Sequence, residues 1–425
     1  MSSESNPKKS LEFNSEKLTH DEGHSEIDVP PEGGYGWVVV FSSFLFHFVV
    51  LGVQYSWGIY QQHYLSHTYA GRVSASSLSL VGTIGAGAMP ICGIVTGRLA
   101  DKYGYKLIAF CGTIGISLGL ILASFATEVW HLYLTQGLLY GVGSSLCFFP
   151  AISVPSQWFK QKRGLAVGIA VSGSGVGGLA LVPLTSKLIS SLGYQWALRI
   201  TGIFSFVLLS VACLLLRTRL KVQVTGPIFD IELFKNLKFI VMWCGGAIFS
   251  FGYLIPIYYI PEYASSINLS VSTGALIVGL LNGASALGRI ILGSAADKFG
   301  RLNLLVICMV VGALSTLLIW TNSSSFAPLL IFALLFGFTA GGFISLFPVV
   351  IASIFGLDQL ATVTGLIYAS TGVGNLAGSP TAGALHDSTA SYMPVILLSG
   401  AAMAVGTLIN ILLRMLVERR IFVKA

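Results

Sequence analysis

The same sequence pattern occurs twice in this chain, about 197 residues apart, and this duplication constrains the fold more than any other feature. The pattern Gly-x-x-x-Asp-Lys-(Tyr/Phe)-Gly occupies residues 97–104 and returns at 293–300. Matches in nearly the same register follow downstream: Phe149-Pro150 with Phe347-Pro348, and Gly175-Val176-Gly177 with Gly372-Val373-Gly374. Several matches in register indicate two homologous halves. In a hydrophobic chain, two such halves build similar bundles with a seam between them, where a solute can bind.

The composition excludes a soluble protein. Of the 425 residues, 54% are hydrophobic and only 10% are charged, whereas a soluble domain carries about 25% charge. A membrane span needs roughly 20 apolar residues, and each span must be helical because lipid cannot satisfy its backbone. Twelve such stretches are predicted, near residues 35–60, 75–98, 107–126, 130–153, 164–191, 196–216, 238–263, 272–296, 303–321, 326–350, 360–385 and 392–416.

The predicted fold is therefore an all-α membrane protein with twelve transmembrane helices in two six-helix halves. The first half covers residues 35–216 and the second covers 238–417, with a cytoplasmic linker at 217–237. Residues 1–34 are polar and are expected to form a disordered cytoplasmic tail, and residues 418–425 form a short tail at the other end of the chain.

The charge distribution predicts the topology. Twenty of the 24 Lys and Arg residues fall on one side of the predicted spans. Because cations gather in cytoplasmic loops, this asymmetry places both termini in the cytoplasm. The net charge of +7 thus reflects membrane orientation, and no nucleic-acid partner is expected. We favour the plasma membrane as the location, with a vacuolar or other internal membrane as the alternative.

The sequence contains no feature of an enzyme. All six cysteines fall inside predicted spans, where they act as small packing residues. The chain lacks the Gly-x-x-x-x-Gly-Lys-(Ser/Thr) phosphate loop and any His, Cys and Asp cluster with metal spacing. We therefore expect no enzymatic activity, no cofactor and no metal.

Two segments resemble the signatures of a known family. Residues 31–37 read Pro-Glu-Gly-Gly-Tyr-Gly-Trp before the first span, and residues 158–173 open the fifth span with a basic cluster followed by small residues. Together they resemble the monocarboxylate transporter family of the major facilitator superfamily, and are most similar to its fungal branch of monocarboxylate-permease-like and riboflavin-transporter-like proteins. The resemblance covers residues 31 to about 417.

The repeated Asp-containing loop also resembles the cytoplasmic signature of the major facilitator superfamily. In that superfamily the Asp belongs to a latch that holds the outward-facing state. The resemblance thus implies that Asp101 is the gate residue of the first half and Asp297 its weaker echo. Either Asp could hydrogen-bond to a nearby helix N-terminus, where anionic groups are favoured. The alternative is that each loop is an ordinary polar turn.

Arg289 is the clearest candidate for substrate binding. It lies eight residues before Asp297, about 12 Å into the eighth span at 1.5 Å per residue. A charge so deep costs roughly 2.5–3.5 kcal/mol on insertion scales, so it usually faces a cavity or a partner. In monocarboxylate transporters an Arg at the matching place binds the carboxylate, and a planar guanidinium suits two carboxylate oxygens. The alternative is a structural Arg near the inner gate.

The chain departs from the family at two sites. Ser285 stands where the family has an acidic partner one turn before the Arg. The family's first-span Lys falls near Gln54, Tyr55 or Ser56, none of which carries its charge. Both changes argue against the proton–lactate mechanism as such, and they make an anionic group on the substrate a more attractive partner for Arg289.

Further polar residues complete the predicted site. His47 near the middle of the first span and Glu262 in the seventh are candidates for proton coupling, each with a structural alternative. Aromatic walls with a few polar groups suit organic ligands. Expected substrate contacts besides Arg289 are Gln54, Tyr55, Tyr253, Asn282, Ser285 and Asn375.

These observations favour a secondary transporter that moves a small organic solute, a carboxylate or other organic anion, by alternating access, with protons as a candidate symported ion. The partners expected are that solute and the lipid bilayer, for a chain that is monomeric or loosely associated. Two alternatives stay open: a non-transporting nutrient sensor of the same fold, and a carrier of another solute such as riboflavin.

Overall fold

The computed structural model describes residues 31–418 apart from 74, 220–230 and 357–359. Within these residues every regular element is helical. The first part of the chain forms α1 (Tyr35–Tyr55), α2 (Trp57–His63), α3 (Ala75–Tyr103), α4 (Tyr105–Ala123), α5 (Val129–Leu132), α6 (Tyr140–Ser153), α7 (Pro155–Trp158), α8 (Arg163–Leu192) and α9 (Tyr194–Leu215). The second part forms α10 (Leu237–Ser266), α11 (Val271–Phe299), α12 (Arg301–Leu314), α13 (Phe326–Phe355), α14 (Leu360–Thr389) and α15 (Met393–Val417).

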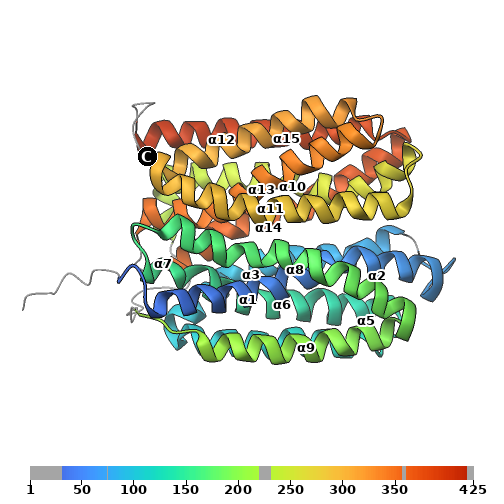
Figure 1. The fold of residues 1–425 in the computed structure, drawn as a ribbon, viewed down its shortest axis with the longest axis horizontal. Helices are drawn as coiled ribbons and strands as arrows, with labels where there is room; N and C mark the ends of the chain where they lie inside the picture. The colour runs from blue at the N-terminus through green and yellow to red at the C-terminus, as the bar shows by residue number, and fades with distance from the viewer. Residues whose placement is uncertain (1–30, 74, 220–230, 357–359, 419–425) are drawn as a thin grey trace, which may run out of the picture.

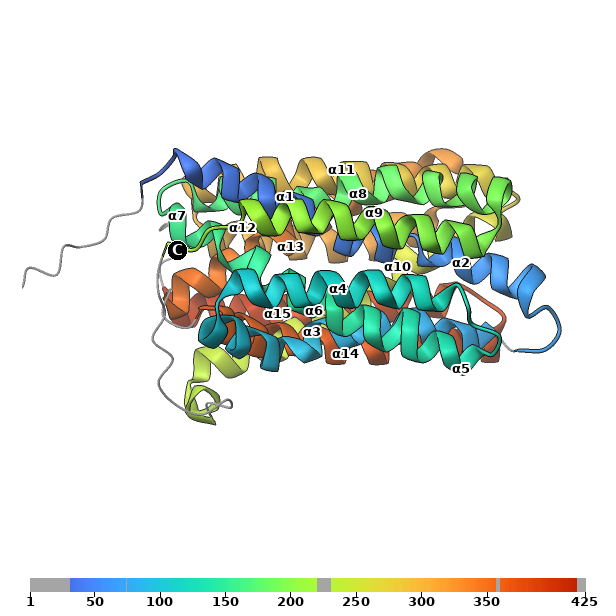
Figure 2. The same ribbon diagram turned by 90° about the horizontal axis from the view of Figure 1, so that it is seen from below.

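The helices lie side by side in two groups. Figure 1 shows α1 to α9 on one side of a seam and α10 to α15 on the other, with all long helices roughly parallel to one axis. Across the seam, α3 packs against α14 and α8 packs against α11. Glycine makes this close approach possible: a Cβ atom at Gly365 would lie 2.0 Å from the Gly93 carbonyl oxygen. Figure 2 shows the same bundle turned by 90° about the horizontal axis.

Eleven of the helical segments in the described residues are long and apolar enough to cross a membrane. They correspond to eleven of the twelve predicted spans. The twelfth, predicted at 360–385, is the 30-residue helix α14, which is long enough but lies outside that set. Its composition explains the difference, because 13 of its 30 residues are Gly, Ser or Thr.

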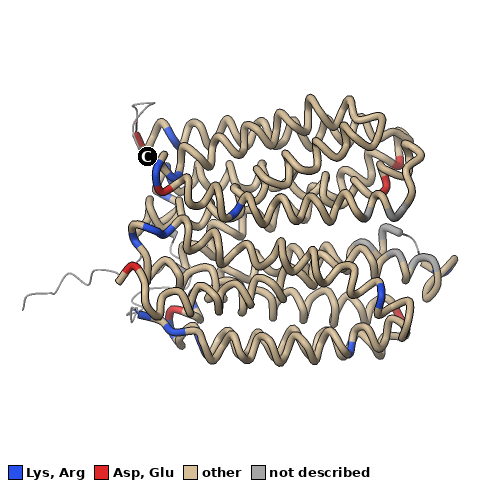
Figure 3. Tube along the Cα trace, viewed as in Figure 1, with Lys and Arg blue, Asp and Glu red and all other residues tan. Residues whose placement is uncertain are grey.

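Both ends of the described chain lie at the same end of the bundle, which we call the terminal end (Figure 1). Most of the Lys and Arg residues drawn in Figure 3 gather there as well. The two copies of the repeated loop also lie at the terminal end, where they connect α3 to α4 and α11 to α12. The last glycine of each copy, Gly104 and Gly300, has a φ angle of 93° and 100°, a conformation that favours glycine and permits the tight turn.

Candidate functional site

Arg289 is a buried cation at the seam between the two groups of helices. Its side chain on α11 is 1% exposed, and its Nη1 donates a hydrogen bond of 2.7 Å to the carbonyl oxygen of Val171 on α8. Its Nε has no hydrogen-bond partner. Among the described residues, no Asp or Glu forms an ion pair with it. A charge buried this way without a counter-ion is costly.

Three other polar side chains lie within electrostatic range of Arg289. Its charge acts on His47 of α1, Tyr253 of α10 and Tyr368 of α14. Phe148 of α6 lies between two of them, with its ring centroid 5.2 Å from that of His47 and 5.6 Å from that of Tyr368. Helices from both sides of the seam therefore converge on one centre.

Tyr368 and Phe148 were not predicted from the sequence. Tyr368 has a buried hydroxyl without a hydrogen-bond partner. Its place in the duplication gains meaning only once the contacts of Arg289 are known. At the offset of 197 that relates Gly175 to Gly372, Tyr368 is the counterpart of Val171, whose carbonyl group binds Arg289.

One ring nitrogen of His47 is hydrogen-bonded, and the other has no hydrogen-bond partner. Its Nδ1 lies 2.7 Å from the carbonyl oxygen of Ser43, and its Nε2 is buried without a partner. A carbonyl oxygen only accepts hydrogen bonds, so Nδ1 must carry a hydrogen. Nε2 is therefore the only atom of this ring that can gain a proton.

Some other predicted contacts lie near this centre. Tyr55 of α1 lies near Tyr253 of α10. A Cβ atom at Gly178 would lie 2.9 Å from the Tyr55 ring and 3.5 Å from the Asn282 amide carbon, so these two side chains flank one point of α8. Asn282 also donates to the Val278 carbonyl oxygen at 3.1 Å within its own helix.

The remaining predicted contacts are less closely tied to it. Gln54 donates to the Gly82 carbonyl oxygen at 3.3 Å on the same side of the seam. Ser285 is buried, and its carbonyl oxygen lies against Gly341 of α13. Asn375, two turns along α14 from Tyr368, has a buried Oδ1 without a partner. Glu262 is exposed near the last turn of α10, among His386 and Asp387, far along that helix from the terminal end.

The two repeated aspartates join the two sides of the seam at the terminal end. Asp101 on α3 accepts the Thr362 N–H at 3.1 Å and the Thr362 hydroxyl at 2.7 Å, in the first turn of α14. Asp297 on α11 accepts the N–H groups of Gly164 and Leu165 at 3.0 and 3.1 Å, in the first turn of α8. Each carboxylate thus caps a helix N-terminus on the opposite side, where negative charge is favoured. Each carboxylate accepts two hydrogen bonds from the opposite side, and the predicted gate roles of Asp101 and its weaker echo Asp297 stay predictions.

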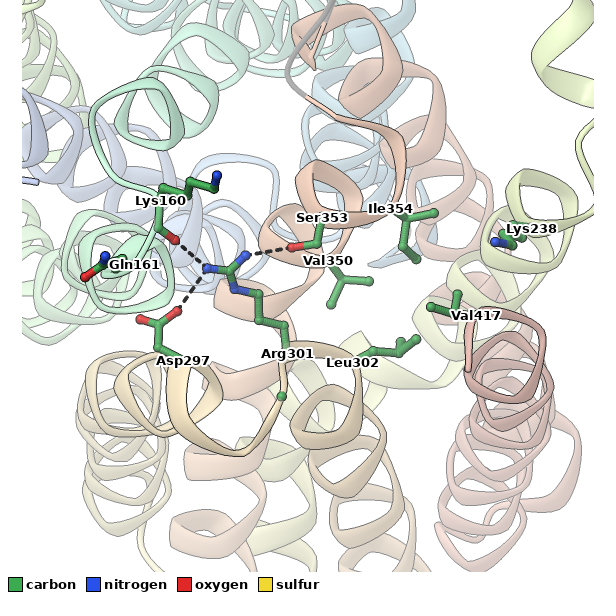
Figure 4. Close-up of a pocket in the computed structure, with 11 residues that line it drawn as sticks. Lys160, Gln161, Lys238, Asp297, Arg301, Leu302, Val350, Ser353, Ile354 and Val417 are labelled. Atoms are coloured by element: carbon green, nitrogen blue, oxygen red, sulfur yellow. Dashed lines mark hydrogen bonds and ion pairs between the residues drawn. The ribbon is translucent and has the colours of Figure 1, made fainter. Parts of the chain in front are cut away.

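Arg301 strengthens the connection at Asp297. Its Nη2 lies 3.3 Å from Asp297 Oδ1 and donates to the Lys160 carbonyl oxygen at 2.8 Å, and its Nη1 donates to the Ser353 hydroxyl at 2.9 Å. Figure 4 shows this guanidinium between the loop that carries Lys160 and the helices on the other side of the seam. The seam is therefore closed at the terminal end.

Glu32 holds the same loop from the other direction. Its carboxylate accepts the backbone N–H groups of Lys160, Gln161 and Lys162 at 2.5, 2.6 and 3.1 Å. Burial acts to raise the pKa of Glu32, but the three N–H groups and the nearby Lys162 ammonium outweigh it and hold the pKa below its ordinary value. The segment 31–37, singled out in the sequence, thus holds the loop that Arg301 binds, directly before the first turn of α8 that Asp297 caps.

Two bundles of helices long and apolar enough to span a membrane meet at a seam that holds a buried cation and is bonded shut at one end. The family model described as Major Facilitator Superfamily matches residues 37–293 and 242–421. The chain belongs to the major facilitator superfamily. The membership predicted from the sequence is confirmed.

Relatives and solved structures agree with this assignment. The chain is 33% identical to "MFS transporter asaE" of Aspergillus flavus, over 89% of this chain and 87% of that one. It is 30% identical to "Aspyridones efflux protein apdF" of Emericella nidulans, over 92% of this chain and 80% of the relative. Neither relative is named as a monocarboxylate transporter. The fold is similar to that of the transporter FucP in its outward conformation, with a TM-score of 0.66, 15% identity, and coverage of 89% and 99% of the two chains. The protein is therefore a transporter and not an enzyme.

Proposed function

We propose that this protein is a secondary transporter that carries a small organic anion through the seam by alternating access. One observation carries the proposal: Arg289 is 1% exposed and has no carboxylate partner among the described residues, yet it keeps a free Nε. A substrate carboxylate supplies the missing charge and can accept from a planar guanidinium through both oxygens. Tyr253 and Tyr368 add hydroxyl groups and aromatic walls suited to an organic ligand.

The aspartate bonds at the terminal end support alternating access. They hold the two sides of the seam together at that end, so a substrate at Arg289 would exchange with the opposite end in this state. Opening requires both capped helices to be released. The positive-inside rule places the terminal end in the cytoplasm, and the plasma membrane is the favoured location.

We further propose that a proton travels with the anion on His47. Because Nδ1 already donates to Ser43, His47 can donate to an anion only after Nε2 has gained a proton. One proton and one monovalent anion together leave the charge of the site unchanged. Glu262 is the weaker candidate, because it is exposed far along α10 from the terminal end.

The direction proposed is export. Relatives carry the names "Aspyridones efflux protein" and "Agnestins efflux protein", the latter from Paecilomyces divaricatus at 29% identity over 91% of this chain. An aromatic acid made inside the cell would leave down its own gradient. The motifs at residues 31–37 and 158–173 favour a carrier of the monocarboxylate type. Larger anions and riboflavin are alternative substrates and should be tested beside monocarboxylates.

The test is solute flux in vesicles that contain the purified protein and no ATP. A panel of aromatic and aliphatic monocarboxylates, with riboflavin included, is loaded on one side. We expect saturable flux of an anion, lost in Arg289→Ala and weakened in Arg289→Lys, with Arg199→Ala as the control because Arg199 contacts Phe125, Trp196 and Ser124 instead. Equal flux in Arg289→Ala would refute the anion site. Ligand binding without any flux would instead indicate a sensor.

A further inference from the structure

A pocket of about 690 Å³ lies at the terminal end, next to the bonds that close the seam (Figure 4). One wall comes from the loop before α8, and the others come from the first turns of α10 and α12 and the last turns of α13 and α15. The lining residues that matter below are Lys160, Lys238, Arg301, Leu302, Ile354 and Val417.

The pocket carries uncompensated positive charge. Asp297 is the one acidic residue among those that line it, and its oxygens already accept from Gly164, Leu165 and Arg301. The ammonium groups of Lys160 and Lys238 have no ion-pair or hydrogen-bond partner within the described part of the chain. Two free cations on opposite walls of one cavity attract an anion.

The pocket also has an apolar surface and lies where several candidate membrane spans end. Of its aliphatic lining residues, Ile354 and Val417 are partly exposed, whereas Leu302 and Val350 are only 2% and 1% exposed. The lining residues stand at the ends of four membrane-spanning segments, Leu237–Ser266, Arg301–Asn322, Phe326–Phe355 and Met393–Val417. Basic pockets at the ends of spans are where phospholipid headgroups bind. A ligand that matches both surfaces is an anion with a hydrocarbon chain.

We propose that this pocket binds the headgroup of an anionic membrane phospholipid, which Lys160 and Lys238 attract from opposite walls, with its hydrocarbon against Ile354 and Val417. The Lys160 wall lies on the opposite side of the seam from the other walls, so the site is complete only while the terminal end is closed. The lipid therefore stabilises the closed state, since a ligand favours the conformation that it binds. The preference of the lipid for the closed state rests on the proposed alternating access, whereas lipid binding to the pocket does not.

The experiment measures the apparent melting temperature of the full chain in detergent as phosphatidic acid, phosphatidylcholine or inorganic phosphate is added. We expect phosphatidic acid to raise it, and the other two to leave it nearly unchanged. In the double variant K160Q/K238Q the lipid should bind about 25-fold more weakly, at about fivefold per lysine. The matched control is K102Q/K298Q, which removes two exposed cations at the same end outside the pocket.

Equal stabilisation of wild type and K160Q/K238Q would overturn the site. An equal shift with inorganic phosphate or with phosphatidylcholine would overturn the assignment to an anionic lipid. These readouts need no transport. A protein that binds phosphatidic acid through the two lysines but moves no anion would refute the transport proposal alone.

Discussion

Asp101→Asn should loosen the closed end of the seam without altering the shape of the side chain. Asp101 is buried, and its Oδ2 accepts two hydrogen bonds from Thr362 across the seam. The amide is isosteric and keeps one acceptor oxygen, but it removes the charge that strengthens both bonds and interacts with the first turn of α14.

The size of the effect follows from the number of bonds. A hydrogen bond to a charged group contributes about 1.5–3 kcal/mol and a neutral one about 0.5–1.5. The loss is thus about 1 kcal/mol per bond, or about 2 kcal/mol for the two cross-seam bonds. At about 1.4 kcal/mol per factor of ten, the ratio of closed to open terminal ends should fall about 30-fold.

The assay is the distance between spin labels on cysteines introduced at Lys162 and Lys298, which are exposed on opposite sides of the seam. Cys111 is exposed and is first replaced by serine. We expect a longer distance to gain population in Asp101→Asn. The control is Asp387→Asn, whose side chain is 77% exposed near the far end of α14. Identical distance distributions for the two variants would refute the reasoning.

Three further outcomes can be measured. Glu32→Gln should speed hydrogen exchange at the backbone amides of Lys160, Gln161 and Lys162 about tenfold. Because folding lowers the pKa of Glu32, the protection of these amides in wild type should be full above about pH 4.3, the pKa of an unfolded Glu. It should be lost only as the pH falls through the lower pKa of the folded state. His47→Gln should abolish the pH dependence of flux but retain anion binding at fixed pH, and an unchanged pH profile would exclude His47. Gly168→Ala should lower the apparent stability by about 1–3 kcal/mol, because its Cβ would lie 2.3 Å from the Arg289 carbonyl oxygen; Gly279→Ala, with nothing within 4 Å, is the control.

The duplicated pattern and the apolar runs were sufficient to predict the fold. Membrane spans are set by local composition, and the repeat fixes how many copies to expect. The sequence also predicts Arg289 as a candidate site residue, because a lone cation inside an apolar run is conspicuous. The burial and free Nε of that side chain could be learned only from the structure.

The partners of these residues could not be predicted, because they come from segments far away in the chain. Thr362 lies 261 residues from Asp101, and Lys160 lies 128 residues from Glu32. Tyr368 sits in a stretch of small residues that reads as ordinary helix packing. No local pattern specifies which helix of one half meets which helix of the other, so the polar contacts across the seam stay hidden until the fold is known.

The unusual composition of α14 has a consequence for biogenesis. A helix with 13 Gly, Ser or Thr residues in 30 gains little from entering hydrocarbon by itself. In the finished molecule α14 lies against α3 and α10, which shield its small polar face from lipid. The insertion of α14 therefore depends on helices that are made earlier. The second six-helix half can complete its assembly only after the first half has been inserted into the bilayer.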